Sequence, residues 1–409
     1  MNCRFCHAGA TLPFIDLVNA PPSNAFLTRM QLGEPESFFP LKVFVCERCW
    51  LVQLEDSKKC DEIFNSKYAY FSSFSSSWLR HCEKYVDQMI SRLGLGAKAF
   101  VVEVASNDGY LLQYFVRAGI PCLGIEPTSG TAAAAREKGV DTREVFWGKG
   151  AAQQLVADRG PCDLMLGNNV LAHVPEINDF VDGFRIALAP RGTLTFEFPH
   201  LLNLIRFKQF DTIYHEHFSY LSLSTTRKIL AAHGLTVYDV DELPTHGGSL
   251  RLYVRHDDNT ELRVSSSVSA LEEREIAAGL HDASGYRDFQ RAADDIRASV
   301  LAFLYEQRSA GRRVVGYGAA AKGNTLLNYC GLKGTDLVQF VADASPHKQG
   351  LFLPGSHIPV VSEKDLRAVE PDFVVILPWN LREEITQQLA YVRRWGGRFI
   401  TCVPELKVD

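Results

Sequence analysis

The chain has 409 residues, of which 46% are hydrophobic, so it is long enough for two or three domains with substantial cores. Its formal net charge of -5 at pH 7 argues against a general role at nucleic acids or membrane surfaces. No apolar run reaches membrane-spanning length, and the N-terminus lacks the apolar stretch of a signal peptide. We therefore expect a cytoplasmic protein, a monomer or small homo-oligomer, with neither nucleic acid nor membrane as a partner.

Two Cys-x-x-Cys pairs mark the first segment, residues 1–72. The pairs are Cys3 with Cys6 and Cys46 with Cys49, and each two-residue gap places both sulfurs on one tight turn. Two such turns together make a closed four-thiolate site, which is typical of structural Zn²⁺. A redox pair and a disulfide are the alternatives, and the scattered remaining cysteines suit a reducing cytoplasm. We expect a zinc-binding module in which residues 38–55 form two short strands around the second turn.

Helical and strand-like segments alternate regularly over residues 73–258. Residues 76–93 carry apolar side chains at helical spacing and end before a glycine. Four short apolar runs come next, at 99–106, 121–127, 163–170 and 192–198, and each is closed by polar or glycine residues. This rhythm predicts a mostly parallel, Rossmann-like α/β sheet with its ligand site at the carboxyl ends of the strands.

The ends of the first three of these strands carry small and polar residues that suit S-adenosylmethionine (SAM). The cofactor residues that we expect are Glu103, Ala105, Ser106, Asn107 and Gly109 after the first strand, Glu126 and Pro127 after the second, and Asn168 and Asn169 after the third. Small residues let the backbone approach a ligand, and the acid that follows about twenty residues later can accept both hydrogen bonds of a ribose diol. The first loop resembles the acidic-plus-small loop of class I SAM methyltransferases. An NAD-type dehydrogenase is the alternative, but that loop has few glycines.

Titratable side chains are concentrated in residues 210–225, which follow the fourth strand. They are Tyr214, His215, Glu216, His217 and Tyr220, and His173 can join them from the neighbouring strand end. An imidazole titrates near neutral pH, so one of these histidines suits a general base that removes a moderately acidic C–H proton. A metal site through His-x-His and a plain polar surface loop are the alternatives.

The last segment, residues 259–409, is predicted to form a second Rossmann-like α/β domain. A polar, largely helical stretch runs to residue 308, and a glycine-rich turn at residues 316–325 then joins a strand to a helix. Lys322 and Asn324 at the start of that helix can hold a pyrophosphate, and Trp379 ends a later strand on the same side. NAD is the rival ligand, and a loop that only packs is the third interpretation.

The order of the motifs resembles that of one enzyme family. A four-cysteine module is followed by YFSSFSSSW, EVASNDG, NNVLAHVP, YHEHFSYLS, HGGSLR and GYGAAAKGNT. This order is similar to that of the SAM-dependent deoxysugar C-methyltransferases, which act on nucleotide-linked 4-ketosugars and usually methylate C-3. The resemblance covers essentially the whole chain. It implies that the middle domain binds SAM and that the nucleotide-linked 4-keto-deoxysugar binds between the domains.

The same resemblance implies a role for individual residues. His217 would be the base, with Tyr214, Glu216 and His173 beside it, and Tyr68 would contact the sugar. The further substrate contacts that it implies are Tyr70, His246, Lys322, Asn324 and Trp379.

We therefore expect a SAM-dependent C-methyltransferase that works through a histidine-generated enolate and contains structural zinc. Methylation at a sugar oxygen or nitrogen is the alternative within enzymes. A zinc-containing binding protein with a degenerate methyltransferase fold is the alternative outside them, and its acidic balance opposes nucleic acid. A zinc hydrolase is disfavoured because all four apparent ligands are thiolates.

Overall fold

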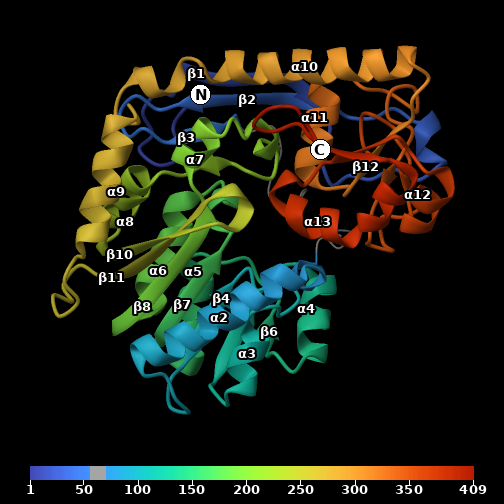
Figure 1. The fold of residues 1–409 in the computed structure, drawn as a ribbon. Helices are drawn as coiled ribbons and strands as arrows, with labels where there is room; N and C mark the ends of the chain where they lie inside the picture. Colours follow the sequence, from blue (N-terminus) through green and yellow to red (C-terminus); the bar gives the residue numbers. More distant parts are fainter. Residues whose placement is uncertain (56–70) are drawn as a thin grey trace.

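The computed structural model describes residues 1–55 and 71–409, which form three β-sheets with helices packed around them (Figure 1). The fold is mixed α/β, as predicted. Tyr68 and Tyr70, two of the predicted sugar contacts, lie outside the described residues. Within those residues, no helix combines the length and the apolar character that crossing a bilayer requires.

The first sheet belongs to the N-terminal cysteine module and has four antiparallel strands in the order β1-β2-β3-β9. They are β1 (Leu12–Ala20), β2 (Phe39–Val45), β3 (Val52–Leu54) and β9 (Ser219–Tyr220). The second cysteine turn lies between β2 and β3, as predicted. Strand β9 comes from the histidine-containing segment and pairs with β3 through Tyr220 and Val52. The sheet of the cysteine module therefore holds one end of that segment in place.

The second sheet has seven strands in the order β10-β11-β8-β7-β4-β5-β6. The strands from β8 to β6 are parallel, and β11 pairs antiparallel with β8. The strands are β4 (Val101–Val104), β5 (Cys122–Ile125), β6 (Thr142–Arg143), β7 (Cys162–Asn168), β8 (Leu188–Pro199), β10 (Leu235–Leu243) and β11 (Ser249–His256). Every residue of β4 is buried, because helices cover both faces of a parallel sheet, and three of its four residues are valine.

Helices flank this central sheet. They are α2 (Ser76–Leu93), α3 (Leu112–Arg117), α4 (Ser129–Glu137), α5 (Lys149–Arg159), α6 (Ile177–Ala187) and α8 (Leu223–Ala232). Helix α7 (Leu201–Arg206) instead packs into the core that the cysteine module shares with the third unit. The helix predicted over residues 76–93 is α2. The Ser75 side chain accepts a hydrogen bond from the N–H of Trp78 at its start, and Gly94 ends it at a φ of 61°, which favours glycine.

The third sheet has six strands in the order β14-β13-β12-β15-β16-β17, all parallel except β17. The strands are β12 (Val314–Tyr317), β13 (Val341–Ala342), β14 (Val360–Val361), β15 (Phe373–Ile376), β16 (Arg398–Thr401) and β17 (Lys407–Val408). Helices α11 (Ala321–Tyr329), α12 (Glu363–Val369) and α13 (Arg382–Gln388) pack with it. The predicted strand, glycine turn and helix at residues 314–329 are thus present.

Two helices connect the second and third sheets where the sequence predicts a polar helical stretch. They are α9 (Ser266–Ala277) and α10 (Phe289–Ser309). Val268 of α9 belongs to the core of the central unit. Phe289 of α10 stacks on Phe14 of β1, with ring centres 4.5 Å apart. Figure 1 shows α10 lying lengthwise along the cysteine module toward the third sheet, so this helix binds the two units together.

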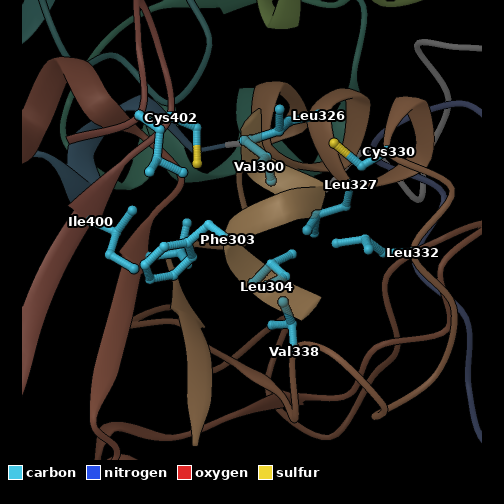
Figure 2. Close-up of a pocket in the computed structure, with 12 residues that line it drawn as sticks. Val300, Phe303, Leu304, Leu326, Leu327, Cys330, Leu332, Val338, Ile400 and Cys402 are labelled. Carbon is cyan, nitrogen blue, oxygen red and sulfur yellow. The ribbon is translucent and has the colours of Figure 1, made fainter. Parts of the chain in front are cut away.

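A small apolar cavity lies in the core of the third unit (Figure 2). The side chains that line it come mainly from α10, α11 and β16 and include Val300, Leu304, Leu326 and Ile400. Among the described residues, no charged side chain lines it. A ligand site needs a few polar groups to orient its ligand, so we assign this cavity to the core.

Candidate active site and cysteine cluster

The four predicted metal ligands lie together. The sulfur atoms of Cys3, Cys6, Cys46 and Cys49 are all within 4.8 Å of one another. The two shortest separations are 3.6 Å between Cys3 and Cys49 and 3.5 Å between Cys6 and Cys46, far beyond a disulfide bond of about 2.05 Å. The disulfide alternative is therefore wrong. Four sulfurs about 2.3 Å from a central Zn²⁺ stand about 3.8 Å apart, so these thiols fit that ion.

Arg4, inside the first cysteine turn, connects this cluster to the histidine-containing loops. Its guanidinium donates a hydrogen bond to the carbonyl oxygen of Pro175 at 3.3 Å and lies 5.3 Å from the ring centre of Phe218. Pro175 follows His173 by two residues, and Phe218 follows His217 directly. The first cysteine turn thus packs against both loops that carry the predicted catalytic imidazoles.

The first predicted cofactor loop turns sharply at the end of β4. Ala105, Asn107 and Gly109 have φ angles of 60°, 48° and 73°, in a region that residues other than glycine rarely adopt. Backbone strain of this kind is concentrated at ligand sites. A Cβ at Gly109 would lie 3.0 Å from Val140. This glycine therefore makes room for the protein's own packing, and not for a ligand as the sequence suggests.

Two acids of the first two strands are buried beneath this loop. Glu126 accepts hydrogen bonds from the backbone N–H groups of Asn107 and Thr128, both at 2.9 Å, and so ties the two strand ends together. An ionised carboxylate has about four acceptor positions, so Glu126 can still accept from ribose hydroxyls. Burial raises the pKa of Glu103 well above its ordinary value, and the Tyr110 hydroxyl opposes that shift.

The end of β7 offers a polar side chain without a protein partner. Asn168 is 6% exposed, and within the described chain its amide oxygen and nitrogen have no hydrogen-bond partner. Leaving such a group unpaired costs about 1–3 kcal/mol, so a ligand with both donors and acceptors fits this position, as SAM does. Asn169 beside it has a φ of 52°. Of the other predicted contacts, Ser106 is buried against Gly124 and Pro127 is half-buried.

His217 is the centre of an aromatic group just before β9. Its Nδ1 lies 2.7 Å from the carbonyl oxygen of Thr212, and because a carbonyl can only accept, Nδ1 carries the proton. In the neutral ring, Nε2 is then the proton acceptor. The ring centres of Tyr214 and His173 lie 4.0 Å and 4.6 Å from that of His217. The structure thus brings the predicted base, phenol and second imidazole together.

Both imidazoles have strongly lowered pKa values. Burial lowers the pKa of His217 well below its ordinary value, the charge of a protonated His173 lowers it further, and the hydrogen bond to Thr212 opposes the shift. Burial also lowers the pKa of His173 to about 4, against a hydrogen bond to the backbone of Glu216. Both rings are therefore neutral at pH 7, which is the state that a general base needs.

The two residues between Tyr214 and His217 face the cysteine module instead. Nε2 of His215 lies 3.2 Å from the carbonyl oxygen of Pro40, and Glu216 accepts a hydrogen bond from the side chain of Asn24 at 2.6 Å. Their side chains anchor the loop. Among residues 1–55 and 71–409, the four cysteines are the only group of three or more potential ligands that lie close enough for one metal ion, so a His-x-His metal site is not formed there.

Predicted substrate contacts from the third unit meet the same site. The ammonium of Lys322 lies 4.5 Å from the ring centre of Trp379 and donates to the side chain of Asn380 at 2.7 Å. Its charge lowers the pKa of both His217 and His246, and burial contributes the larger part of each shift. Asn324 is 1% exposed, and its amide has no hydrogen-bond partner within the described chain.

The second glycine loop is filled by the protein itself. A Cβ at Gly318 would lie 2.5 Å from Pro378. Asp343, at the end of the neighbouring strand, accepts a hydrogen bond from the N–H of Ala319 at 2.7 Å, and Lys348 donates to the Ala319 carbonyl at 2.9 Å. A dinucleotide-binding fold would use that acid for the ribose. These contacts fit a loop that packs better than they fit an NAD site.

Two buried acids near the His217 group were not predicted from the sequence. Glu197, at the end of β8, accepts hydrogen bonds from His81 at 2.9 Å and Arg251 at 2.7 Å, and these groups lower its pKa to about 2 although burial acts in the opposite direction. Asp211 accepts from the indole N–H of Trp379 at 2.7 Å. The available signal is a phenylalanine directly beside each acid, in FEF and FDT, because an acid that is buried with its aromatic neighbour needs a partner.

Three family models match successive parts of the chain. They are described as a zinc binding domain (residues 3–64), a methyltransferase domain (residues 78–240) and a C-methyltransferase C-terminal domain (residues 244–404). The predicted boundaries at residues 72 and 258 stay predictions. The three matches follow the order of the cysteine module, the central sheet and the third sheet.

One curated relative matches along the whole chain. The C-methyltransferase NovU from Streptomyces niveus is 34% identical over 407 residues, which cover 100% of this chain and 96% of that protein.

Two solved structures are similar to one part of the chain. Magnesium protoporphyrin IX methyltransferase from Synechocystis PCC 6803 is 17% identical with a TM-score of 0.33, covering 44% of this chain and 81% of that one. A SAM-dependent methyltransferase from Anabaena variabilis is 12% identical with a TM-score of 0.36, covering 42% and 83%. Both structural similarities are remote, and we draw no conclusion from them. The full-length match and the three domain matches show that the chain belongs to the C-methyltransferase family.

Proposed function

We propose that this SAM-dependent C-methyltransferase acts on a nucleotide-linked 4-keto-deoxysugar, at the C-3 carbon beside the ketone, with His217 as the base. The observation that carries the proposal is the state of His217. Its tautomer is fixed by Thr212, its ring is neutral, and it lies among groups from the central and third units. Nε2 is therefore ready to accept a proton.

A C–H beside a ketone is far more acidic than an ordinary C–H, because the electron pair left behind is delocalised onto the oxygen as an enolate. Nε2 of His217 takes this proton and the ring becomes an imidazolium. The lowered pKa of His217 belongs to the ligand-free protein, and negative charge on the substrate raises it again. Lys322 offers the matching positive charge to the anionic substrate. Placing such a group in advance is worth about 3–4 kcal/mol in comparable oxyanion sites.

The strand ends of the central sheet would hold the methyl donor. Asn107, Glu126 and Asn168 lie at the carboxyl ends of neighbouring strands. SAM, when bound, supplies the methyl group that the enolate carbon accepts. The four cysteines would hold Zn²⁺ at a closed site, so we assign the ion a structural role.

The test is incubation with SAM and a panel of nucleotide-linked 4-keto-deoxysugars, with products examined by mass spectrometry and NMR. We expect one added methyl on a branched carbon for at least one substrate. Exchange of the C-3 hydrogen in deuterated water without SAM tests the base separately. A methyl on oxygen or nitrogen would replace the proposal with the corresponding alternative, and no transfer to any ketosugar would overturn the substrate class.

A further inference from the structure

Asp211 occupies a position that the proposed reaction leaves without a role. It is fully buried in the short 3-10 helix η4 (Phe210–Thr212), and its neighbour Thr212 provides the carbonyl that fixes His217. One carboxylate oxygen accepts from the indole N–H of Trp379 at 2.7 Å. The other oxygen is buried and has no hydrogen-bond partner in residues 1–55 and 71–409.

Trp379 connects this acid to Lys322. Its ring lies 4.5 Å from the Lys322 ammonium. The partly buried ring packs directly against Gly247, where an added Cβ would lie 2.4 Å from it. A second hydrogen bond runs from Thr325 of α11 to the carbonyl of Ile213 at 2.9 Å. The turn that carries Asp211 is therefore tied to both elements that present Lys322 and Trp379.

We propose that Asp211 is a positioning residue that holds the indole of Trp379 beneath Lys322 and provides a buried carboxylate near that ammonium. The inference rests on the proposed function, in which Lys322 faces an anionic substrate. The titratable groups whose charges act on Lys322 or that its charge acts on are Asp211, His217 and His246. Asp211 is the one acid among these three groups, so it is the one that can provide a negative charge.

The titration behaviour agrees with this geometry. Burial lowers the pKa of Lys322, and the charge of Asp211 opposes that shift. Burial raises the pKa of Asp211 to about 6, and Lys322 opposes that shift in turn. Each group therefore stabilises the charged form of the other.

Two variants separate the charge from the hydrogen bond. Asp211→Asn keeps a side-chain oxygen that can accept from Trp379 but removes the charge. Trp379→Phe keeps the charge and an aromatic ring but removes the N–H donor. We expect Asp211→Asn to move the basic limb of the kcat/KM profile to lower pH by about one unit or more, because the ammonium loses its counter-charge. We expect Trp379→Phe to raise KM for the sugar nucleotide and to leave that limb in place.

A measurement on the unaltered protein keeps the proposal testable if Asp211→Asn does not fold. Lysine labelled with ¹³C at Cε gives a Lys322 signal that is assigned from its loss in Lys322→Arg. This signal should show a second inflection near pH 6, where Asp211 takes up its proton. A single lysine transition without that inflection, or a basic limb that Asp211→Asn leaves unmoved, would overturn the inference. If the protein methylates no ketosugar, the proposed function fails, yet the inflection still reports whether the two charges are coupled.

Discussion

Nδ1 of His217 and the carbonyl oxygen of Thr212 are 2.7 Å apart. This contact decides which ring nitrogen is basic, because the carbonyl can only accept and Nδ1 must therefore carry the proton. The basic nitrogen is Nε2, which is the atom that the proposed reaction needs. The tautomer is set by the backbone of the same loop, and no second side chain is required to orient the base.

Replacing His217 by glutamine should abolish methyl transfer and C-3 hydrogen exchange while leaving SAM binding intact. Glutamine is close in size and polar, but its amide is not a useful base at neutral pH. Calorimetric titration with SAM and deuterium exchange of the ketosugar measure the two properties. His215→Gln is the matched control, because His215 faces Pro40, and it should retain exchange. An active His217→Gln enzyme would remove His217 as the base.

The sequence predicts the elements of this fold well and the direction of side chains less well. The helix over residues 76–93 and the central strands β4, β5, β7 and β8 follow from apolar spacing and end signals, which are local, whereas β6, β10 and β11 were not predicted. In YHEH, the pattern does not indicate that His215 and Glu216 turn toward the cysteine module while His217 turns the other way. That difference arises from the pairing of β9 with β3, a contact between residues far apart in the chain.

The sequence also does not show which group pairs with each buried acid. Asp343 follows a strand, as a ribose-binding acid would, yet its carboxylate is bonded to the N–H of Ala319. Asp211 is marked only by the phenylalanine before it, and its partner Trp379 lies 168 positions later in the sequence. The local sequence pattern can indicate that a buried acid needs a hydrogen-bond partner, but only the tertiary packing shows which group is that partner.

Loss of the metal should impair turnover more than SAM affinity. The first cysteine turn contacts the His173 and His217 loops through Arg4, whereas Glu126 and Asn107 lie on the central sheet. We expect one zinc per chain by elemental analysis, and Cys46→Ser should lower zinc content, solubility and kcat with little change in the Kd for SAM. Cys122→Ser, outside the cluster, is the control. Full activity in a soluble, zinc-free protein would contradict this expectation.

Glu126→Gln should weaken SAM binding by about tenfold, which corresponds to about 1.4 kcal/mol. The amide retains one acceptor oxygen, so it can no longer bond to both Asn107 and Thr128 while also accepting from a ribose. Calorimetry with SAM and with S-adenosylhomocysteine measures the change. Glu137→Gln at the end of α4 is the control and should bind normally. An unchanged Kd would place the ribose elsewhere.

NAD should not bind to the loop at residues 316–325, because its backbone N–H and carbonyl at Ala319 are already bonded to Asp343 and Lys348. Fluorescence titration with NADH measures this directly, and saturable binding of NADH would restore the dinucleotide interpretation.

Gly318→Ala should lower the melting temperature, because the φ of Gly318 is 85° and the new methyl group would meet Pro378. Gly311→Ala is the comparison, with a similar φ of 68° but open space around it, and it should cost less.

Stability should fall as the pH drops from about 7 to 5.5. His173 and His246 each have a pKa lowered to about 4, so below pH 6.5 the unfolded chain binds protons that the folded chain does not. Each histidine then costs about 1 kcal/mol by pH 5.5. Asp211 acts in the opposite direction, because its pKa is raised to about 6 and the folded state gains a proton there. Glu197, with a pKa of about 2, contributes stability that is lost only below its ordinary value of 4.5.

The balance is a net loss, since His173, His246 and His217 act in that direction, whereas the raised pKa values of Asp211 and Glu103 oppose it. Urea unfolding at pH 7.0 and 5.5 should give a lower free energy of unfolding at the acid value. His246→Asn removes one of the groups and should make the slope with pH shallower. A free energy of unfolding that is the same at both pH values would contradict the net loss expected here.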